Sequence, residues 1–256
     1  MKKQLFFYLY STKDTLYCET NKIHFKCLEY FKNAFDEATI GIAVDDLSDK
    51  TLIKDTEKIF FDIFSDTVER LNFIIMKNDP QLCEAAFFYN EIALKLNDLD
   101  LVFFGHGKGI TNLNREDINV EGLKYWIVGM YYASLFKLDE NINKITTKSF
   151  LFSGPFLHIS EDFIGYEGSF YWLNAKRIHT YCATINKELP KLCGRLYAER
   201  FPESIIKKNL VNILITSFNN YYIKNYLNFY TNGVNACDML GYINDNFKKI
   251  YQYAIS

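Results

Sequence analysis

The stretch Leu99-Asp-Leu-Val-Phe-Phe-Gly-His-Gly-Lys-Gly109 decides the fold of this 256-residue chain. Its apolar run from Leu101 to Phe104 is long enough for a strand buried in a sheet and too short for a buried helix. Glycine lets backbone N–H groups approach an anion, and His106 and Lys108 would project into the same crevice. Three alternating glycines follow the run directly: Gly105, Gly107 and Gly109. We therefore predict a buried strand that ends in an anion-binding turn; a tight turn with two solvated side chains is the alternative.

The chain before this strand alternates between strand and helix patterns. Apolar runs predict strands at Leu5 to Tyr10, Thr39 to Val44 and Asn72 to Met76. Apolar residues at helical spacing predict helices over Ile23 to Phe35, Leu52 to Leu71 and Gln81 to Leu96. Such alternation with short connections predicts an α/β fold, in which a mostly parallel, Rossmann-like sheet is flanked by helices on both faces.

Polar residues end each of these strands, and the carboxyl ends of parallel strands share one edge of a sheet. The four polar ends are Ser11-Thr12, Asp45-Asp46, Asn78-Asp79 and His106 to Lys108. We predict a nucleotide site at this edge. Ser11 and Thr12 are candidates for contacting the base, and Asp45 and Asp46 for accepting from a ribose hydroxyl or a base N–H. A solvated turn is the alternative at each position.

The second half of the chain is less regular. We expect a polar loop over Asn112 to Glu121, a helix over Gly122 to Leu138, and a strand, turn and edge strand over Phe150 to Ile159. Residues 160–174 combine glycines, carboxylates and large aromatic residues in one expected loop, and from Ala175 the pattern is mostly helical. We expect a catalytic domain over residues 1–200 and a C-terminal helical extension packed on it over residues 201–256.

Composition and charge exclude several classes of protein. A formal charge of -2 argues against a broad surface for nucleic acid. The six cysteines are scattered without a C-x-x-C pair, which is typical of thiols in a reducing cytoplasm. The first apolar run is shorter than the roughly 7–15 residues of a signal-peptide core, and no segment approaches the ~20 apolar residues of a membrane span. We expect a cytoplasmic protein, with lysines of the C-terminal helices available for peripheral contact with the membrane.

The fourth strand resembles that of the A-type fold of nucleotide-sugar glycosyltransferases, in which a strand of the form Asp-x-Val-x-Phe ends in Asp-x-Asp. That motif holds a divalent metal on the donor diphosphate. Here Asp100 to Phe104 fits the strand, but His106-Gly107-Lys108 occupies the motif. A lysine and backbone N–H donors can neutralise a leaving diphosphate in place of a metal, so the resemblance implies transfer without an obligatory metal. A Lys108 side chain that simply points to water is the alternative.

Residues 98–199 also resemble a loosely defined family of glycosyltransferase-like proteins from surface-polysaccharide gene clusters. Its members carry His-Thr-Lys-Gly after the equivalent strand, then Trp-Arg, and later His-x-Ser-Gly-Asn-Phe-Trp-Trp-Ala-Asn. This chain has Phe-Phe-Gly-His-Gly-Lys-Gly, a helix containing Trp126, and Glu-Gly-Ser-Phe-Tyr-Trp-Leu-Asn. It departs from the family pattern at Gly107, Ile127, Gly165 and Glu167.

The resemblance implies transfer of a sugar from a nucleotide-sugar to a glycan or lipid-linked acceptor of a cell-surface or viral glycan. An inverting transferase needs a general base on the acceptor hydroxyl, worth about 10²–10⁴ in rate, and Glu167 or Asp162 could supply it. Trp172 and Phe170 could stack on sugar faces, although such aromatic residues also build cores. Glu199 matches a late glutamate of the family, and it could equally form a simple helical pair with Arg195.

The motif also allows other interpretations. A buried strand ending in His-Gly also resembles caspase-like cysteine peptidases, but the next apolar strand ends in Ser153-Gly154 rather than Cys, and Cys182 and Cys193 fall in helical pattern. The loss of Asp-x-Asp would equally suit a non-catalytic sugar-binding or assembly protein on a degenerate transferase fold. The turn lacks the spacing of a phosphate-binding NTPase loop.

Overall fold

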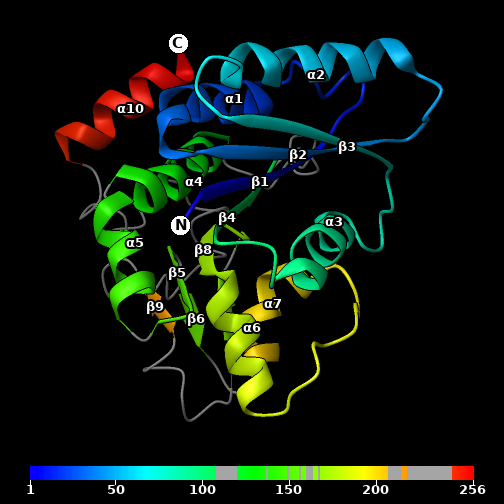
Figure 1. Ribbon diagram of the computed structural model, residues 1–256. Coiled ribbons are helices and arrows are strands. Elements are labelled where there is room, and N and C mark those ends of the chain that lie inside the picture. Colours follow the sequence, from blue (N-terminus) through cyan, green and yellow to red (C-terminus); the bar gives the residue numbers. More distant parts are fainter. Residues whose placement is uncertain are drawn as a thin grey trace.

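The computed structural model describes residues 1–107, 120–136, 138–148, 150–155, 157–159, 164–166, 168–206, 215–217 and 244–256. Its centre is a seven-stranded sheet of order β3-β2-β1-β4-β8-β5-β9 (Figure 1). The strands are β1 (Lys3–Tyr10), β2 (Glu37–Val44), β3 (Arg70–Lys77), β4 (Leu101–His106), β5 (Phe152–Gly154), β8 (Tyr171–Asn174) and β9 (Ile215–Ser217). All pairings are parallel except those of β8, which runs antiparallel to β4 and β5. A second, two-stranded sheet joins β6 (Leu157–Ile159) to β7 (Ile164–Tyr166).

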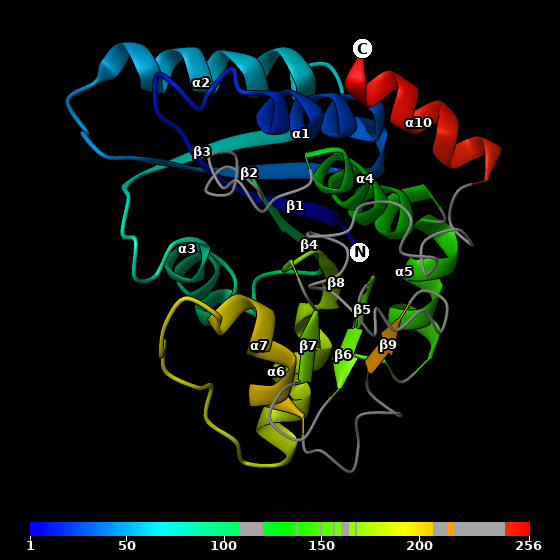
Figure 2. The same ribbon diagram turned by 180° about the vertical axis from the view of Figure 1, so that it is seen from behind.

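Helices cover both faces of the main sheet, as the two opposite views show (Figures 1 and 2). On the α1 face lie α1 (Glu19–Tyr30), α2 (Lys50–Phe64) and α4 (Val120–Tyr131), which a π-helix over Tyr132–Phe136 prolongs. On the α3 face lie α3 (Glu84–Glu91), α6 (Ala175–Thr184) and α7 (Tyr197–Ile205). Helix α5 (Leu138–Thr147) packs on β5 and β8, and α10 (Asp245–Ile255) packs on α1 and α4. Short 3-10 helices span Lys32–Ala34 and Ala93–Lys95.

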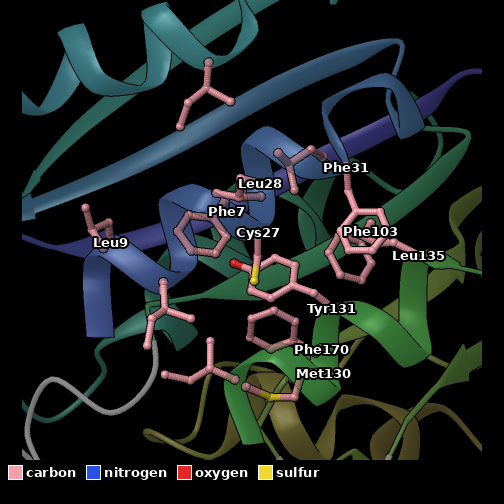
Figure 3. Packing of buried hydrophobic residues seen from close by; sticks show 14 of the residues in the cluster. Phe7, Leu9, Cys27, Leu28, Phe31, Phe103, Met130, Tyr131, Leu135 and Phe170 are labelled. Atoms are coloured by element: carbon pink, nitrogen blue, oxygen red, sulfur yellow. The ribbon is translucent and has the colours of Figure 1, made fainter. Parts of the chain in front are cut away.

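The mostly parallel sheet with helices on both faces confirms the predicted α/β class. The central strands are buried on both faces, which explains their unbroken apolar runs. Along β1, Phe7 points into the core on the α1 face, and its neighbours Phe6 and Tyr8 point into the core on the α3 face. Figure 3 shows Phe7 beside Cys27 and other side chains of the α1-face core. Within the described part of the chain, no helix combines the length and the apolar character that crossing a membrane requires.

A buried carboxylate ties the amino ends of three strands together. Glu37 on β2 accepts hydrogen bonds from Lys2 Nζ at 2.6 Å, Gln4 Nε2 at 2.9 Å and an Arg70 guanidinium nitrogen at 2.9 Å. Burial alone would raise the pKa of Glu37, but the hydrogen bonds from Lys2, Gln4 and Arg70 outweigh it and lower that pKa. The charge of Glu37 therefore stabilises the folded state at neutral pH.

The structure differs from the sequence prediction at helix ends and in the second half of the sheet. Helix α2 stops at Phe64 rather than at Leu71. A turn follows it, in which Thr67 N–H and Val68 N–H both donate to Phe64 O, and β3 begins at Arg70. The expected loop 160–174 contains β7 and β8. The expected domain boundary at 200 falls inside α7, and the expected helical extension contributes β9 to the main sheet beside β5.

Candidate functional site

The four parallel strands bring their carboxyl ends to one edge of the sheet, as their pattern predicts. The pairs closest to that edge are Tyr10 with Ala43, Val44 with Lys77, and Tyr8 with His106. Lys108, Asp162 and Glu167 lie outside the described residues. The described part of the candidate site consists of side chains and backbone groups at the carboxyl ends of these strands.

Asp45 links the ends of three strands. One carboxylate oxygen accepts from Tyr10 Oη at 2.8 Å, and the other accepts from Asn78 Nδ2 at 3.2 Å. Burial, together with the hydrogen bond to Asp45, raises the pKa of Tyr10 to about 12. The neighbouring Asp46 accepts from the N–H and hydroxyl of Ser48, and these bonds lower the pKa of Asp46. Asp45 is thus an exposed, oriented carboxylate, whereas Asp46 holds the turn before α2.

In the turn after β1, the hydroxyl groups of Ser11 and Thr12 form hydrogen bonds with other side chains of the protein. Ser11 is fully buried, and its Oγ lies 3.0 Å from Thr56 Oγ1 on α2. The hydroxyl of the half-buried Thr12 lies 3.0 Å from Thr15 Oγ1, and Thr12 N–H donates to the same oxygen at 2.9 Å. The expected contact of Ser11 with a nucleotide base is not supported, because its side chain has no exposed surface.

His106 ends β4 on the α3 face and is buried. Its Nε2 lies 3.0 Å from the carbonyl oxygen of Gly168 and 3.9 Å from a carboxylate oxygen of Glu84, the first residue of α3. Because a carbonyl oxygen can only accept, Nε2 carries the proton and His106 donates to Gly168. The imidazole is therefore oriented by the turn that precedes β8.

A second predicted residue converges on that turn. Glu199, on α7, accepts from Gly168 N–H at 3.0 Å. Gly168 has φ 88°, which favours glycine, and Ser169 has φ 54°, an uncommon value for a residue with a side chain. Such conformations cost about 1–3 kcal/mol and persist where the surroundings hold them. His106 and Glu199 hold Gly168 from two elements, and Glu167, the expected base, is the residue before it in the sequence.

The two described glycines of the motif, Gly105 and Gly107, take part in the packing and pairing of β4. A Cβ on Gly105 would lie 3.1 Å from a ring carbon of Phe170, so the glycine leaves space for that ring. Gly107 N–H donates to Tyr8 O at 2.8 Å and prolongs the pairing with β1. The expected donor contact through the Gly107 amide is therefore not supported.

Phe170 and Trp172 are buried in the α1-face core (Figure 3 labels Phe170). The Phe170 ring lies 5.0 Å from that of Tyr131 between centroids, nearly perpendicular to it. Trp172 packs 5.2 Å from Phe103, and its Nε1–H donates to Ser134 O at 3.1 Å. A role for these two rings in stacking on a sugar is not supported, because neither has an exposed face.

Sequence reasoning missed the polar groups around His106 on the α3 face. Glu84 was hidden in the pattern of a helix, and Tyr8 in an apolar strand. Burial raises the pKa of Tyr8, and the nearby Cys83 and Glu84 raise it further. Cys83 has φ 47°, and burial raises the pKa of its thiol, with a further contribution from the nearby Glu84. The one available signal was period-2 alternation along β1, which puts Tyr8 on the same face as His106.

Two further cysteines, Cys182 and Cys193, are candidate nucleophiles from the sequence. Burial raises the pKa of Cys182, which lies on α6, and Cys193 is exposed in the segment before α7. Among the described residues, no group of three or more His, Cys, Asp or Glu side chains could hold a metal ion.

No protein-family model matches the chain, and no curated protein matches it significantly.

Proposed function

We propose that the protein is a glycosyltransferase of the A-type fold that uses a nucleotide-sugar donor without an obligatory metal. One observation carries the proposal: the strand Asp100–Phe104 delivers His106 to a turn at Gly168 that Glu199 also holds, at the edge where Asp45 is exposed. The mixed sheet, with β8 antiparallel beside the motif strand β4, is compatible with this fold. The resemblance of residues 98–199 to polysaccharide-cluster transferases supports the same reaction.

In the proposed reaction, the carboxylate of Glu167 takes the proton of an acceptor hydroxyl. The acceptor oxygen forms a bond to the anomeric carbon as the bond from that carbon to the diphosphate oxygen breaks. Lys108 neutralises the charge on the leaving nucleoside diphosphate, and Asp45 accepts from the ribose or the base. His106 and Glu199 act as positioning residues, because both bond the turn that follows Glu167 in the sequence.

Binding of the donor product tests the proposal. Thermal shift with a panel of nucleoside diphosphates should show stabilisation that persists with chelator and is unchanged by Mn²⁺; a ligand at 100 times its Kd adds about 2.7 kcal/mol. Lys108→Ala should abolish binding. Lys58→Ala, which removes an exposed lysine paired with Asp62 on α2, should bind as the wild type does. Unchanged affinity in Lys108→Ala would refute the scheme.

The role of His106 is testable with two substitutions. His106→Gln places an amide N–H where it can still donate to Gly168 O, whereas His106→Ala leaves that carbonyl without this donor. For a positioning residue, the glutamine variant should keep most of the kcat for donor hydrolysis or transfer, and the alanine variant should lose about tenfold or more, on the order of one buried hydrogen bond. Equal loss in both variants would show that the imidazole itself reacts.

A non-catalytic binding protein is the second candidate, favoured by the internal use of Ser11 and of the Gly107 amide. Such a protein would bind a nucleoside diphosphate but would neither hydrolyse nor transfer from any donor, with or without chelator. Measuring turnover of a donor that binds decides between the two candidates.

The proposed acceptor is a glycan or a lipid-linked sugar on the cytoplasmic side of a membrane. On α10, Lys248 and Lys249 are exposed and are the described lysines that would meet anionic lipid there. Co-sedimentation with anionic vesicles should exceed that with neutral vesicles, and Lys248→Glu with Lys249→Glu should remove the difference.

A further inference from the structure

Glu84 is a buried carboxylate beside His106 that has no role in the proposed reaction. It is the first residue of α3, and one of its oxygens lies 3.9 Å from His106 Nε2. The side chains of Glu84 and His106 are 9% and 11% exposed. Two ionisable groups this close and this withdrawn from water affect each other's charge more strongly than exposed groups do. The charge at the end of β4 therefore depends on this pair.

The start of α3 favours the charged form of Glu84. The first backbone N–H groups of a helix carry a partial positive charge, which stabilises a carboxylate in the first turn. A charged Glu84 in turn favours an imidazolium, because an opposite charge within about 4–6 Å shifts a titration by about 1–3 pH units towards the charged form. Burial opposes the charge on the imidazole, but it also keeps the attraction within the pair strong.

The ionisable groups around the pair and its neighbours are mostly acidic. They come from β1, from α3 and the turn before it, and from α7 and the segment before it: Tyr8, Tyr10, Asp79, Cys83, Arg195 and Glu199. Burial raises the pKa of Tyr8, which is paired with His106 across the sheet, and nearby acidic groups raise it further. Three carboxylates, counting Glu84, face one guanidinium among these described residues, and this surplus of negative charge favours an imidazolium.

The hydrogen bond to Gly168 shows where an extra proton on His106 enters. Nε2–H donates to Gly168 O at 3.0 Å in the neutral ring, so a further proton enters at Nδ1. Nε2–H keeps its bond in the imidazolium, where the charge makes the bond stronger. Charging His106 therefore leaves the turn at Gly168 held and adds a positive charge at the end of the motif strand.

We propose that Glu84 keeps His106 doubly protonated at neutral pH, so that the site presents two cations, His106 and Lys108, to the donor diphosphate. This inference rests on the proposed function, in which Lys108 neutralises that diphosphate. Two unit cations carry the same charge as the divalent metal that Asp-x-Asp holds in the A-type fold, and they occupy the position of that motif in the sequence. Glu84 acts through His106 and is a positioning residue.

The imidazolium makes binding of the diphosphate depend on pH. His106 is charged below its titration midpoint, so binding is tight there and weakens as the pH rises through that midpoint. The charge acts on the diphosphate of the donor and of the product alike, so its loss raises Kd and KM and leaves kcat nearly unchanged.

Titration of the His106 ring by NMR tests the charge directly. Its signal is the one of the four histidine signals that His106→Gln removes. The wild-type midpoint should lie above about 6.5, the ordinary value for histidine, and Glu84→Gln should lower it by about one pH unit or more. Glu91→Gln, which removes a carboxylate paired with Lys95 at the other end of α3, is the matched control and should not change it.

Two results of this titration would overturn the proposal. One is a wild-type midpoint below the ordinary value for histidine, which is measured without any variant and so does not depend on how Glu84→Gln folds. The other is the same midpoint in the wild type and in Glu84→Gln.

Calorimetry with uridine, cytidine and guanosine diphosphate tests the link to the ligand. Below both His106 midpoints the wild type and Glu84→Gln should bind equally. Between the midpoints the variant should bind roughly tenfold more weakly, the order of effect of a unit charge about 10 Å away in partly buried surroundings. Comparing the two proteins at the same pH removes the ligand's own titration. Equal Kd values at every pH would overturn this inference alone, whereas no binding by the wild type at any pH would refute the proposed function and this inference with it.

Discussion

Gly105→Ala probes how tightly the motif strand is packed against the turn of the candidate site. The new Cβ would lie 3.1 Å and 3.3 Å from two ring carbons of Phe170, closer than the roughly 3.5–4.0 Å that carbon atoms prefer. The ring cannot move freely, because its centroid lies 5.0 Å from that of Tyr131 and 6.0 Å from that of Phe103, and all three side chains are buried.

The net cost follows from two opposing effects. Overpacking a well-filled core costs about 1–3 kcal/mol. Replacing glycine in a strand restricts the unfolded chain and returns about 0.5–1 kcal/mol. We expect Gly105→Ala to lower the free energy of unfolding by about 1–2 kcal/mol. The m value, which is the slope of that free energy against urea concentration, should stay at its wild-type value.

Urea denaturation followed by tryptophan fluorescence measures this cost, and a double-mutant cycle assigns it to Phe170. Phe170→Leu removes the ring edge, so Gly105→Ala should cost at least about 1 kcal/mol less in that background than in the wild type. Additive effects of the two substitutions, or stabilisation by Gly105→Ala alone, would refute the reasoning.

Three further predictions concern other parts of the molecule. Gly41→Ala should lower the free energy of unfolding by about 2–3 kcal/mol in the same assay, which is more than Gly105→Ala does. The reason is that the new Cβ at position 41 would lie 2.7 Å from a ring carbon of Phe87. Glu37→Gln should lower the free energy of unfolding by about 2 kcal/mol at neutral pH. Because folding lowers the pKa of Glu37, the charged carboxylate stabilises the folded state above pH 4.5, its unfolded pKa, and this stabilisation is lost as the pH falls below that value. The Tm of the variant should therefore fall less steeply with acid than the Tm of the wild type. Iodoacetamide should label the exposed Cys193 and spare the buried Cys27 in the folded protein, and nucleoside diphosphate binding should survive, as read by peptide mass mapping and thermal shift.

The first half of the fold was predictable because its signals are local. Apolar runs such as Leu101 to Phe104 are buried on both faces, so the sequence shows them without reference to distant residues. Strand β8 was not predictable in this way. Its four residues stand in a segment rich in glycine and carboxylates, and they become a strand only by pairing with β4, which lies about 70 residues earlier.

The position of the candidate site was predictable, but the use of its side chains was not. Parallel strands bring their carboxyl ends together by topology alone, which places Asp45 and His106 at one edge. The hydroxyl of Ser11 is instead taken by Thr56 on α2, and His106 is oriented by Gly168 and faces Glu84. Thr56 and Glu84 reach these positions because α2 and α3 pack on the sheet, and Gly168 does so through the turn before β8. No spacing in the sequence encodes these contacts.

The core and the candidate site share one short segment, Gly168 to Phe170. Its first residue is held by His106 and Glu199, and its last is locked into the α1-face core. The φ of 54° at Ser169, between them, is therefore maintained by contacts on both sides rather than by its own preference. If a ring shift in the core loosens this segment, the turn after Glu167 loosens with it. Gly105→Ala should then weaken donor binding or turnover as well as stability, although it removes no group that would touch the donor.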